Sequence, residues 1–191
     1  MAGLKTGLTE RTIKNLQLNA GVLLSSYTRG GAIDEDNIIG ATRGGGSFNA
    51  VPELHQAAVD GAPTYTKGLE RCDGWNVNLT FTMVEFTAPA IIRALGAGAS
   101  SNVVETTDTK ITAVTNILAT DYKDVYWVGD TSDGKNVVIL VKNAMNTSGL
   151  SLTASDKGEG TFGLTLQGHH AVDNLGAAPF EIILEGAGAG A

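Results

Sequence analysis

The chain has 191 residues, of which only 17% are charged, and its formal net charge is −7. We do not expect an acidic chain to hold DNA or an anionic membrane tightly, because that affinity comes largely from Lys and Arg. No run of about 20 apolar residues is present, which excludes a membrane-spanning helix, and the single cysteine, Cys72, excludes an intrachain disulfide.

The first 27 residues predict a polar leader followed by a strand. Residues 1–11 lack the basic and then apolar pattern of an export signal, so we expect the chain to stay in a reducing cytosol until it is assembled. Within residues 14–27, apolar side chains occupy the even positions from Leu16 to Leu24, and the polar amides Asn15, Gln17 and Asn19 alternate with them. A period of two predicts a strand with one buried and one solvated side.

A long connection with mixed charges comes next, over residues 28–46. Its charged side chains are Arg29, Asp34, Glu35, Asp36 and Arg43. Connections of this length without regular structure are uncommon in compact domains and are often functional or mobile. Residues 47–59 then predict a second strand, and Pro52 within it indicates an edge strand or a bulge.

The clearest strand pattern covers residues 75–86. Apolar side chains at Trp75, Val77, Leu79, Phe81 and Met83 alternate with Asn76, Asn78, Thr80 and Thr82. A similar segment places Thr165 and Gln167 between Phe162, Leu164 and Leu166. Most solvated strand faces carry Lys, Glu and Arg, whereas neutral amides and hydroxyls suit a surface that stays hydrated and holds nothing tightly. The lining of a conduit would need such a surface.

One helix is predicted, over residues 87–95. Thr87 suits the N-cap, Pro89 falls in the first turn, where a missing N–H does no harm, and Gly96 follows the last turn. Ile91 and Ile92 contribute to one apolar side. A helix this short is not stable alone, so we expect it to dock on a sheet.

The rest of the chain predicts strands. They fall within residues 110–115, 125–128, 136–141, 161–171 and 180–184, and a hairpin covers residues 123–143 with Gly134 in its turn. Residues 137–141 have no polar side, so we expect both of their faces to be covered. The sequence therefore predicts a mainly β fold of seven or more strands with one helix. We place it in a single domain, residues 1–185, followed by a flexible Gly/Ala tail, residues 186–191.

A search for catalytic and ligand-binding motifs gives no candidate. Residues 44–47 lack the lysine of a phosphate-binding loop, and the three carboxylates at residues 34–36 lack the spacing of a calcium loop. His169 and His170 are neighbours on a predicted strand and would point to opposite faces, which disfavours a shared metal ion. We therefore expect no enzymatic activity, no cofactor and no metal.

Several segments, in the same order along the chain, resemble the major tail tube proteins of long-tailed bacteriophages and prophages. The resemblance rests on residues 15–24, residues 40–48 with 59–61, residues 67–87, and residues 156–170 with 179–182. Together these segments reach from about Thr9 to Leu184. No single motif among them is specific, and the likeness depends on their order.

The resemblance implies a β-sandwich or barrel subunit with one short flanking helix. It further implies that six subunits form a ring, that their strands join into one continuous inner barrel, and that stacked rings form a tube for DNA. In such a virion protein, made in the cytoplasm of a bacterial host, the amide and hydroxyl side chains named above would face the lumen. The charged residues of the 28–46 connection would contact a neighbouring ring. Partners would be further copies, initiator, tape-measure and terminator proteins of the tail, and passing double-stranded DNA without specific binding.

Two other interpretations remain open at this point. A tube protein from a contractile tail or a secretion-type injection machine would follow the same physical rules. A β-sandwich module that binds a glycan or a host surface through its glycine-rich loops would instead remain monomeric or form a small closed oligomer.

Overall fold

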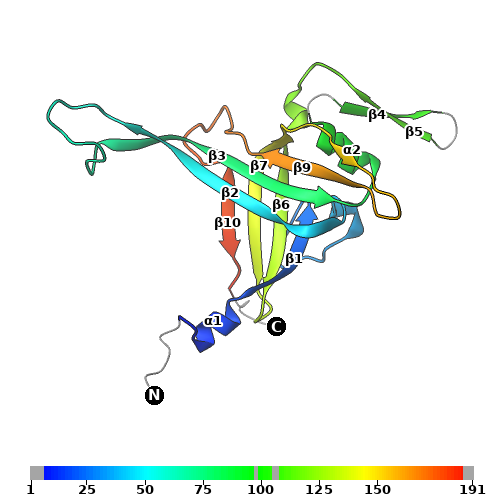
Figure 1. Cartoon of the computed structure of the whole chain (residues 1–191), viewed down its shortest axis with the longest axis horizontal. Helices are drawn as coiled ribbons and strands as arrows, with labels where there is room; N and C mark the ends of the chain where they lie inside the picture. The colour runs from blue at the N-terminus through cyan, green and yellow to red at the C-terminus, as the bar shows by residue number, and fades with distance from the viewer. Residues whose placement is uncertain (1–6, 97–98, 105–107, 187–191) are drawn as a thin grey trace.

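The computed structural model describes residues 7–96, 99–104 and 108–186, and it shows a mainly β chain with two short α-helices (Figure 1). The helices are α1 (Glu10–Lys14) and α2 (Ala88–Leu95), and two 3₁₀ turns cover Glu35–Asn37 and Ala119–Asp121. The strands are β1 (Gln17–Leu24), β2 (Thr42–Gln56), β3 (Glu70–Met83), β4 (Ala99–Val104), β5 (Asp108–Ala113), β6 (Lys123–Thr131), β7 (Asn136–Asn146), β8 (Leu152–Thr153), β9 (Thr161–Gln167) and β10 (Phe180–Leu184).

Eight of the strands form one antiparallel sheet that folds over into two layers. Its order is β1-β6-β7-β9-β3-β2, with β10 also paired to β7 and β8 to β9, while β4 and β5 form a separate hairpin. The first part of β7 pairs with β6 and β10, and its last two residues pair with β9. Figure 1 shows β2, β3 and β9 running across β1, β6, β7 and β10. The end strands β1 and β2 touch without pairing, so the sheet is not closed into a barrel.

The main core lies between the two layers. Its buried side chains include Val77, Leu79, Phe81, Met83, Val125, Val141, Phe162, Leu164 and Leu166. The alternation predicted from Trp75 to Met83 is therefore confirmed, with the apolar side facing inward, whereas the strand predicted to reach residue 86 ends at Met83. A smaller cluster of Leu24, Val128 and Val138 lies on the other side of β1, β6 and β7, under Tyr27 and Ile38. Because β7 contributes to both clusters, residues 137–141 are covered on both faces, as expected.

The predicted helix is confirmed as α2, with the predicted ends. Thr87 Oγ1 accepts a hydrogen bond from the Ala90 amide at 3.3 Å, a proline occupies the first turn, and the C-cap Gly96 has φ +75°. A Cβ at Gly96 would lie 2.3 Å from the carbonyl oxygen of Asn146, so this position requires glycine for space as well as for backbone conformation. Ala90 and Ala94 are the fully buried contacts of α2, whereas Ile91 and Ile92 are only half-buried, because small side chains let the helix approach the sheet closely.

The Thr87→Ala variant is expected to lose about 1 kcal/mol of unfolding free energy, because the first turn of α2 loses its side-chain acceptor. Urea denaturation followed by tryptophan fluorescence measures the loss. The Thr87→Ser variant keeps the hydroxyl and should remain close to the parent. Equal midpoints for both variants and the parent would show that this cap contributes nothing.

The prediction for the N-terminal strand is partly wrong. The strand begins at Gln17, and the five-residue helix α1 precedes it, starting from a capping box between Thr9 and Thr12. The register shifts between Leu18 and Val22, where Asn19 has φ +60° and Gly21 has φ +71°. This bulge interrupts the period of two, and Leu16 and Leu18 are 48% and 42% exposed instead of buried.

The connection predicted at residues 28–46 is shorter and better packed than expected. Ile39 is 6% exposed and belongs to the main core, its amide donates to the Leu23 carbonyl at 2.9 Å, and Ile38 bridges to Leu24. The second strand begins at Thr42, five residues earlier than predicted, and ends at Gln56. It lies at one end of the sheet order, as Pro52 indicates.

The later strands agree with their predictions. The segments predicted at 110–115, 125–128, 136–141, 161–171 and 180–184 are observed as β5, β6, β7, β9 and β10. β9 ends at Gln167, so His169 and His170 follow the strand instead of lying on it as predicted. β6 and β7 form the predicted hairpin, with Gly134 at φ +78°. The predicted leader at residues 1–6 and the Gly/Ala tail beyond Gly186 lie outside the described residues.

β2 and β3 continue as a two-stranded ribbon beyond the rest of the sheet (Figure 1). Pairing of β3 with β9 begins at Asn78, whereas pairing with β2 extends outward to the pair Gln56 and Glu70. We call residues 54–72 the arm. It exposes Leu54 (60%), Val59 (53%) and Tyr65 (82%), and it carries the free Cys72. An isolated two-stranded ribbon is only marginally stable in water, so the arm is a segment that a contact with another molecule would stabilise.

Candidate functional surface

The outer face of β2, β3 and β9 presents a field of neutral polar side chains, bordered by the exposed apolar Val51 opposite Asn76. We call it the polar face, and it consists of Ser47, Asn49, Asn76, Asn78, Thr80, Thr82, Thr165 and Gln167. The strand register aligns these residues in rows: Asn49, Asn78 and Gln167 form one row, and Ser47, Thr80 and Thr165 form the next. All eight are exposed or half-buried, while their neighbours along each strand point into the core.

The side chains of the polar face can bind water but carry no charge. Asn78 Nδ2 donates to Asn76 Oδ1 at 2.8 Å, so part of its hydrogen-bonding capacity is satisfied within the face. The remaining amides and hydroxyls can bind water or exchange weak hydrogen bonds with a passing solute. None of the eight side chains can form an ion pair, so the face has no group that would retain phosphate.

Ser47 and Asn49 belong to the polar face although they were not predicted from the sequence as part of it. The signal was present, because Ser47, Phe48, Asn49 and Ala50 repeat the alternation of residues 75–82 on a shorter scale. The interruption at Pro52 hid it. In the sheet, Pro52 lies opposite Trp75, exposed Val51 lies opposite Asn76, and the register shifts between Glu53 and Leu54, so the alternation of β2 ends at this point.

The three amides predicted to face the lumen from the N-terminal strand are not part of the polar face. Asn15 lies at the C-terminus of α1, where its side chain donates to the Arg11 carbonyl at 2.7 Å. Gln17 donates to the carbonyls of Leu18 and Asn19, both at 2.9 Å, and Asn19 donates to the Asp130 carboxylate at 3.3 Å. These side chains stabilise local turns and the bulge of β1, so that part of the predicted surface does not form a single face with β3 and β9.

The charged residues of the 28–46 connection are dispersed. Arg43 lies in β2 and forms an exposed ion pair with Glu159 at 2.9 Å, a kind of contact that contributes little to stability. Arg29 donates to the Gly186 carbonyl at 3.5 Å. Asp34 precedes the 3₁₀ turn that contains Glu35 and Asp36. The structure therefore does not gather these five residues into one patch, and their contact with a neighbouring ring stays a prediction.

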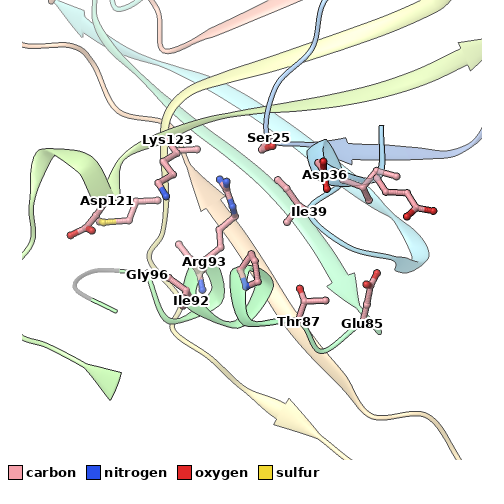
Figure 2. Close-up of a pocket in the computed structure, with 16 residues that line it drawn as sticks. Ser25, Asp36, Ile39, Glu85, Thr87, Ile92, Arg93, Gly96, Asp121 and Lys123 are labelled. Carbon is pink, nitrogen blue, oxygen red and sulfur yellow. The ribbon is translucent and has the colours of Figure 1, made fainter. Parts of the chain in front are cut away.

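A cavity of about 660 Å³ lies between α2, the 3₁₀ turn at Glu35–Asn37 and the start of β6 (Figure 2). Its lining includes Glu35, Asp36, Glu85, Arg93 and Lys123. Arg93 extends from α2 into the cavity, and burial lowers the pKa of its guanidinium. Neither Arg93 nor Lys123 is predicted from the sequence as a site residue, because no local pattern marks a residue as facing a cavity.

Tyr27, Asn136 and Glu185 form a small polar cluster beside the second apolar cluster. Tyr27 Oη donates to Glu185 Oε1 at 2.6 Å, and Asn136 Nδ2 donates to Tyr27 Oη at 3.2 Å and to Glu185 Oε2 at 3.1 Å. Burial raises the pKa of the Tyr27 phenol, and the hydrogen bond to Glu185 raises it further. Burial likewise raises the pKa of Tyr126. The cluster ties the chain after β10 to the segment after β1.

Because the pKa values of Tyr27 and Tyr126 are raised, we expect the folded protein to lose stability at alkaline pH. Because the folded state holds the phenol protons more tightly than the unfolded state, their contribution is complete below the ordinary tyrosine value of 10.0. This contribution to stability is lost as the pH rises through the raised pKa values of the folded state. We expect the thermal midpoint to fall above that pH, and to fall less steeply in Tyr27→Phe. Tyr65→Phe, at an exposed position, is the matched control, and identical alkaline profiles for the two variants would contradict the assignment.

The two adjacent histidines have structural roles. His169 Nδ1 lies 3.0 Å from the Asn143 carbonyl, and His170 Nδ1 lies 2.9 Å from the Ala177 carbonyl. The Trp75 amide donates to His170 Nε2 at 3.3 Å, which assigns the proton of this ring to Nδ1. Within the described ranges, no group of three or more His, Cys, Asp or Glu side chains is placed to hold a metal ion.

Comparison with known protein families finds no family model that matches this chain, and no curated protein matches it either. In the part of the chain that the structure describes, no helix is long and apolar enough to cross a membrane.

Proposed function

We propose that the chain is a structural virion protein that polymerises as stacked rings, most simply hexameric, to form the tail tube of a long-tailed bacteriophage. The observation that carries the proposal is the polar face: eight neutral side chains in register on three adjacent strands, backed by the main core. In the assembled tube, the polar face of each subunit lines the bore through which double-stranded DNA passes.

A neutral, hydrated lining suits the passage of DNA. Lysine or arginine side chains on the bore would replace counterions on the phosphates and would make transit slow and dependent on salt. Each subunit also adds a net charge of −7, so a ring weakly repels the phosphate backbone. DNA then passes as cargo, without a specific binding site.

Open strand edges support assembly into rings. Among the described strands, β2 lies at one end of the sheet order with no strand paired beyond it, and β8 pairs only with β9 at the other side of the same layer. Unpaired edges are templates for association, and natural proteins cover them or close them into barrels. Joining the layers of neighbouring subunits edge to edge would produce a continuous barrel that no single copy encloses.

The proposal includes the partners that a tail tube requires. These are further copies of the chain, an initiator, a tape-measure protein inside the tube and a terminator, with the finished protein located in the virion after synthesis in the host cytoplasm. The same geometry would serve a tube in a contractile tail or in a secretion-type injection machine.

Negative-stain electron microscopy of concentrated protein, together with sedimentation velocity, tests the proposal. The expected result is hollow rings or tubes of uniform diameter that appear above a threshold concentration. A chain that sediments as a monomer at every accessible concentration, or as a small closed oligomer that binds glycans, would contradict it and favour a host-surface binding module.

A further inference from the structure

Strand β10 is the edge of the layer formed by β1, β6, β7 and β10. It pairs with β7 in a regular antiparallel register, and no other described strand pairs with it. Just before the strand, the Lys142 amide donates to the Pro179 carbonyl at 2.9 Å. Just after it, the Glu185 amide donates to the Asn136 carbonyl at 3.0 Å. These two hydrogen bonds fix which residues of β10 face β7.

Bonded and non-bonded residue pairs alternate along an antiparallel ladder. Because Pro179 and Glu185 are both bonded to β7, the even-numbered residues between them direct their N–H and C=O groups away from β7. These residues are Phe180, Ile182 and Leu184. Among the described residues, none forms a backbone hydrogen bond with these outward groups. An unpaired strand edge of this kind is a template for pairing with another chain.

β10 is the most regular of the open edges of the main sheet. β1 contains the bulge described above, β2 contains Pro52 and two register shifts, and β8 has only two residues. β10 keeps one register over its whole length. Its exposed side chains are mostly apolar, with exposed fractions of 53% for Ile182, 40% for Ile183 and 74% for Leu184. A partner strand can therefore pair along all of β10, and it would cover apolar surface.

We propose that β10 pairs with β10 of a second copy of this chain, antiparallel and about a two-fold axis at Ile182. In this register Ile182 lies opposite Ile182 of the second copy, and Phe180 lies opposite Leu184. The outward backbone groups of one strand then meet those of the other, as an antiparallel ladder requires. This pairing goes beyond the tube and does not depend on it. A two-fold pair is closed, so we expect it below the concentration at which tubes appear.

The charges of β10 are compatible with this register. Glu181, the charged residue of the strand, would lie opposite Ile183 of the second copy and not opposite another carboxylate. Within its own subunit, Glu181 forms an ion pair with Lys142 on β7. Like charges directly opposite each other would destabilise a ladder, and the two-fold register avoids them. The strand is thus complementary to itself in backbone groups, apolar side chains and charge.

The arm would cover a strand added beside β10. Phe180 contacts Phe48 and Trp75, with ring centroids 5.6 and 5.3 Å apart, so β2 and β3 cross β10 at its first residue. Figure 1 shows the two strands continuing past β10 into the arm. A second copy paired with β10 would lie beneath the start of the arm, where Leu54 is 60% exposed. One partner would therefore satisfy the open edge and cover part of the arm.

Charge substitutions at Ile182 test the pairing, because this residue would face itself across the axis. Ile182→Lys and Ile182→Glu should each raise the dissociation constant of the dimer at least about tenfold, since like charges then lie opposite each other. An equimolar mixture of the two variants should recover the dimer, because a lysine then faces a glutamate. Sedimentation velocity below the threshold concentration for tubes measures these effects. Val172→Lys, at a position 92% exposed in the loop before β10, is the matched control and should dimerise like the parent.

Amide hydrogen exchange of the parent chain identifies the strand edge without any substitution. Below the tube threshold, the amides of Ile182 and Leu184 should exchange at least about tenfold more slowly at high than at low protein concentration, because pairing protects them. The amides of Glu181 and Ile183 face β7 in both states and should change much less. This measurement decides the question even for a variant that proves unstable.

The other outcomes overturn the pairing of β10 in distinguishable ways. A parent chain that stays monomeric below the tube threshold, with equally fast exchange at Ile182 at all concentrations, would contradict it and leave the proposed function intact. A dimer of Ile182→Lys as stable as that of the parent would place the interface elsewhere. A mixture of the Lys and Glu variants that dimerises no better than either alone would show that β10 meets a different strand. Dimers with these properties but no tubes at any concentration would contradict the proposed function alone.

Discussion

Replacing Asn146 with alanine is expected to lower the free energy of unfolding by about 3 kcal/mol, because the side chain satisfies several buried backbone groups at once. Asn146 is the buried polar residue among the described core positions, at 4% exposure. Its Nδ2 donates to the carbonyls of Ala94 and Gly149, and its Oδ1 accepts from the Thr165 amide at 3.2 Å. The residue thereby joins the end of α2 to β7 and β9, and its loss leaves the Ala94 carbonyl and the Thr165 amide without these partners.

Two further variants make this result specific. Asn146→Asp keeps the volume but replaces the donor with a charge facing the Ala94 carbonyl, so it should destabilise at least as much as alanine. Thr147→Ala, at the exposed neighbour, should change stability by no more than about 0.5 kcal/mol. Urea unfolding measures the stability of all three variants, and the dependence of the unfolding free energy on urea concentration should be the same for each. An Asn146→Ala midpoint equal to that of Thr147→Ala would contradict the role of the amide.

Removing the tip of the arm is expected to abolish polymerisation while leaving the subunit folded. Gln56 and Glu70 are the last paired residues of the ribbon, so residues 57–69 can be replaced by Asn-Gly, which closes a two-residue hairpin at that register. The deletion removes exposed Val59 and Tyr65 and no residue of the main core. If the arm packs on a neighbouring subunit, as its exposed apolar side chains indicate, the shortened chain lacks that contact.

Pelleting above the parent's threshold concentration, with circular dichroism of the dilute subunit, measures this effect. Normal tubes from the shortened chain would show that the arm is dispensable for assembly. A deletion of residues 33–40, within the 28–46 connection, would not test assembly alone, because it removes Ile39 from the main core and would destabilise the subunit. Leu54→Ser, which changes only an exposed arm residue, provides a milder variant that should raise the threshold without preventing assembly.

The parts of the fold that could be predicted are those in which a local signal persists over a whole element. In β3, the alternation from Trp75 to Met83 runs through eight steps without a break, and the sheet buries one side as expected. For α2, a capping threonine, a first-turn proline and a terminal glycine identify both ends. Each of these signals follows from the covalent geometry of a few consecutive residues, so tertiary contacts had little to change.

The predictions that were wrong concern segments whose local structure depends on contacts with residues far away in the sequence. Gly21 has a positive φ, and the Trp127 indole, which donates to the Ala20 carbonyl at 2.9 Å, lies where a Cβ at this position would be, so the bulge requires glycine here. The resulting bulge displaces Leu16 and Leu18 from the core, although the sequence alternates through them without a visible interruption. Asn146 and Arg93 were missed for a related reason: the importance of each depends on an element from another part of the chain.

The central claim, that the polar face lines the bore of an assembled tube, is tested most directly by cysteine accessibility in a Cys72→Ser background. The Thr82→Cys variant places a thiol on the exposed end of the polar face, and Lys110→Cys places one on the β4–β5 hairpin. In tubes, we predict that the thiol at position 82 reacts with a small maleimide but not with a maleimide on a dextran wider than the bore, while the thiol at position 110 reacts with both. Equal reaction of position 82 with the dextran reagent in tubes and in dispersed subunits would contradict the account.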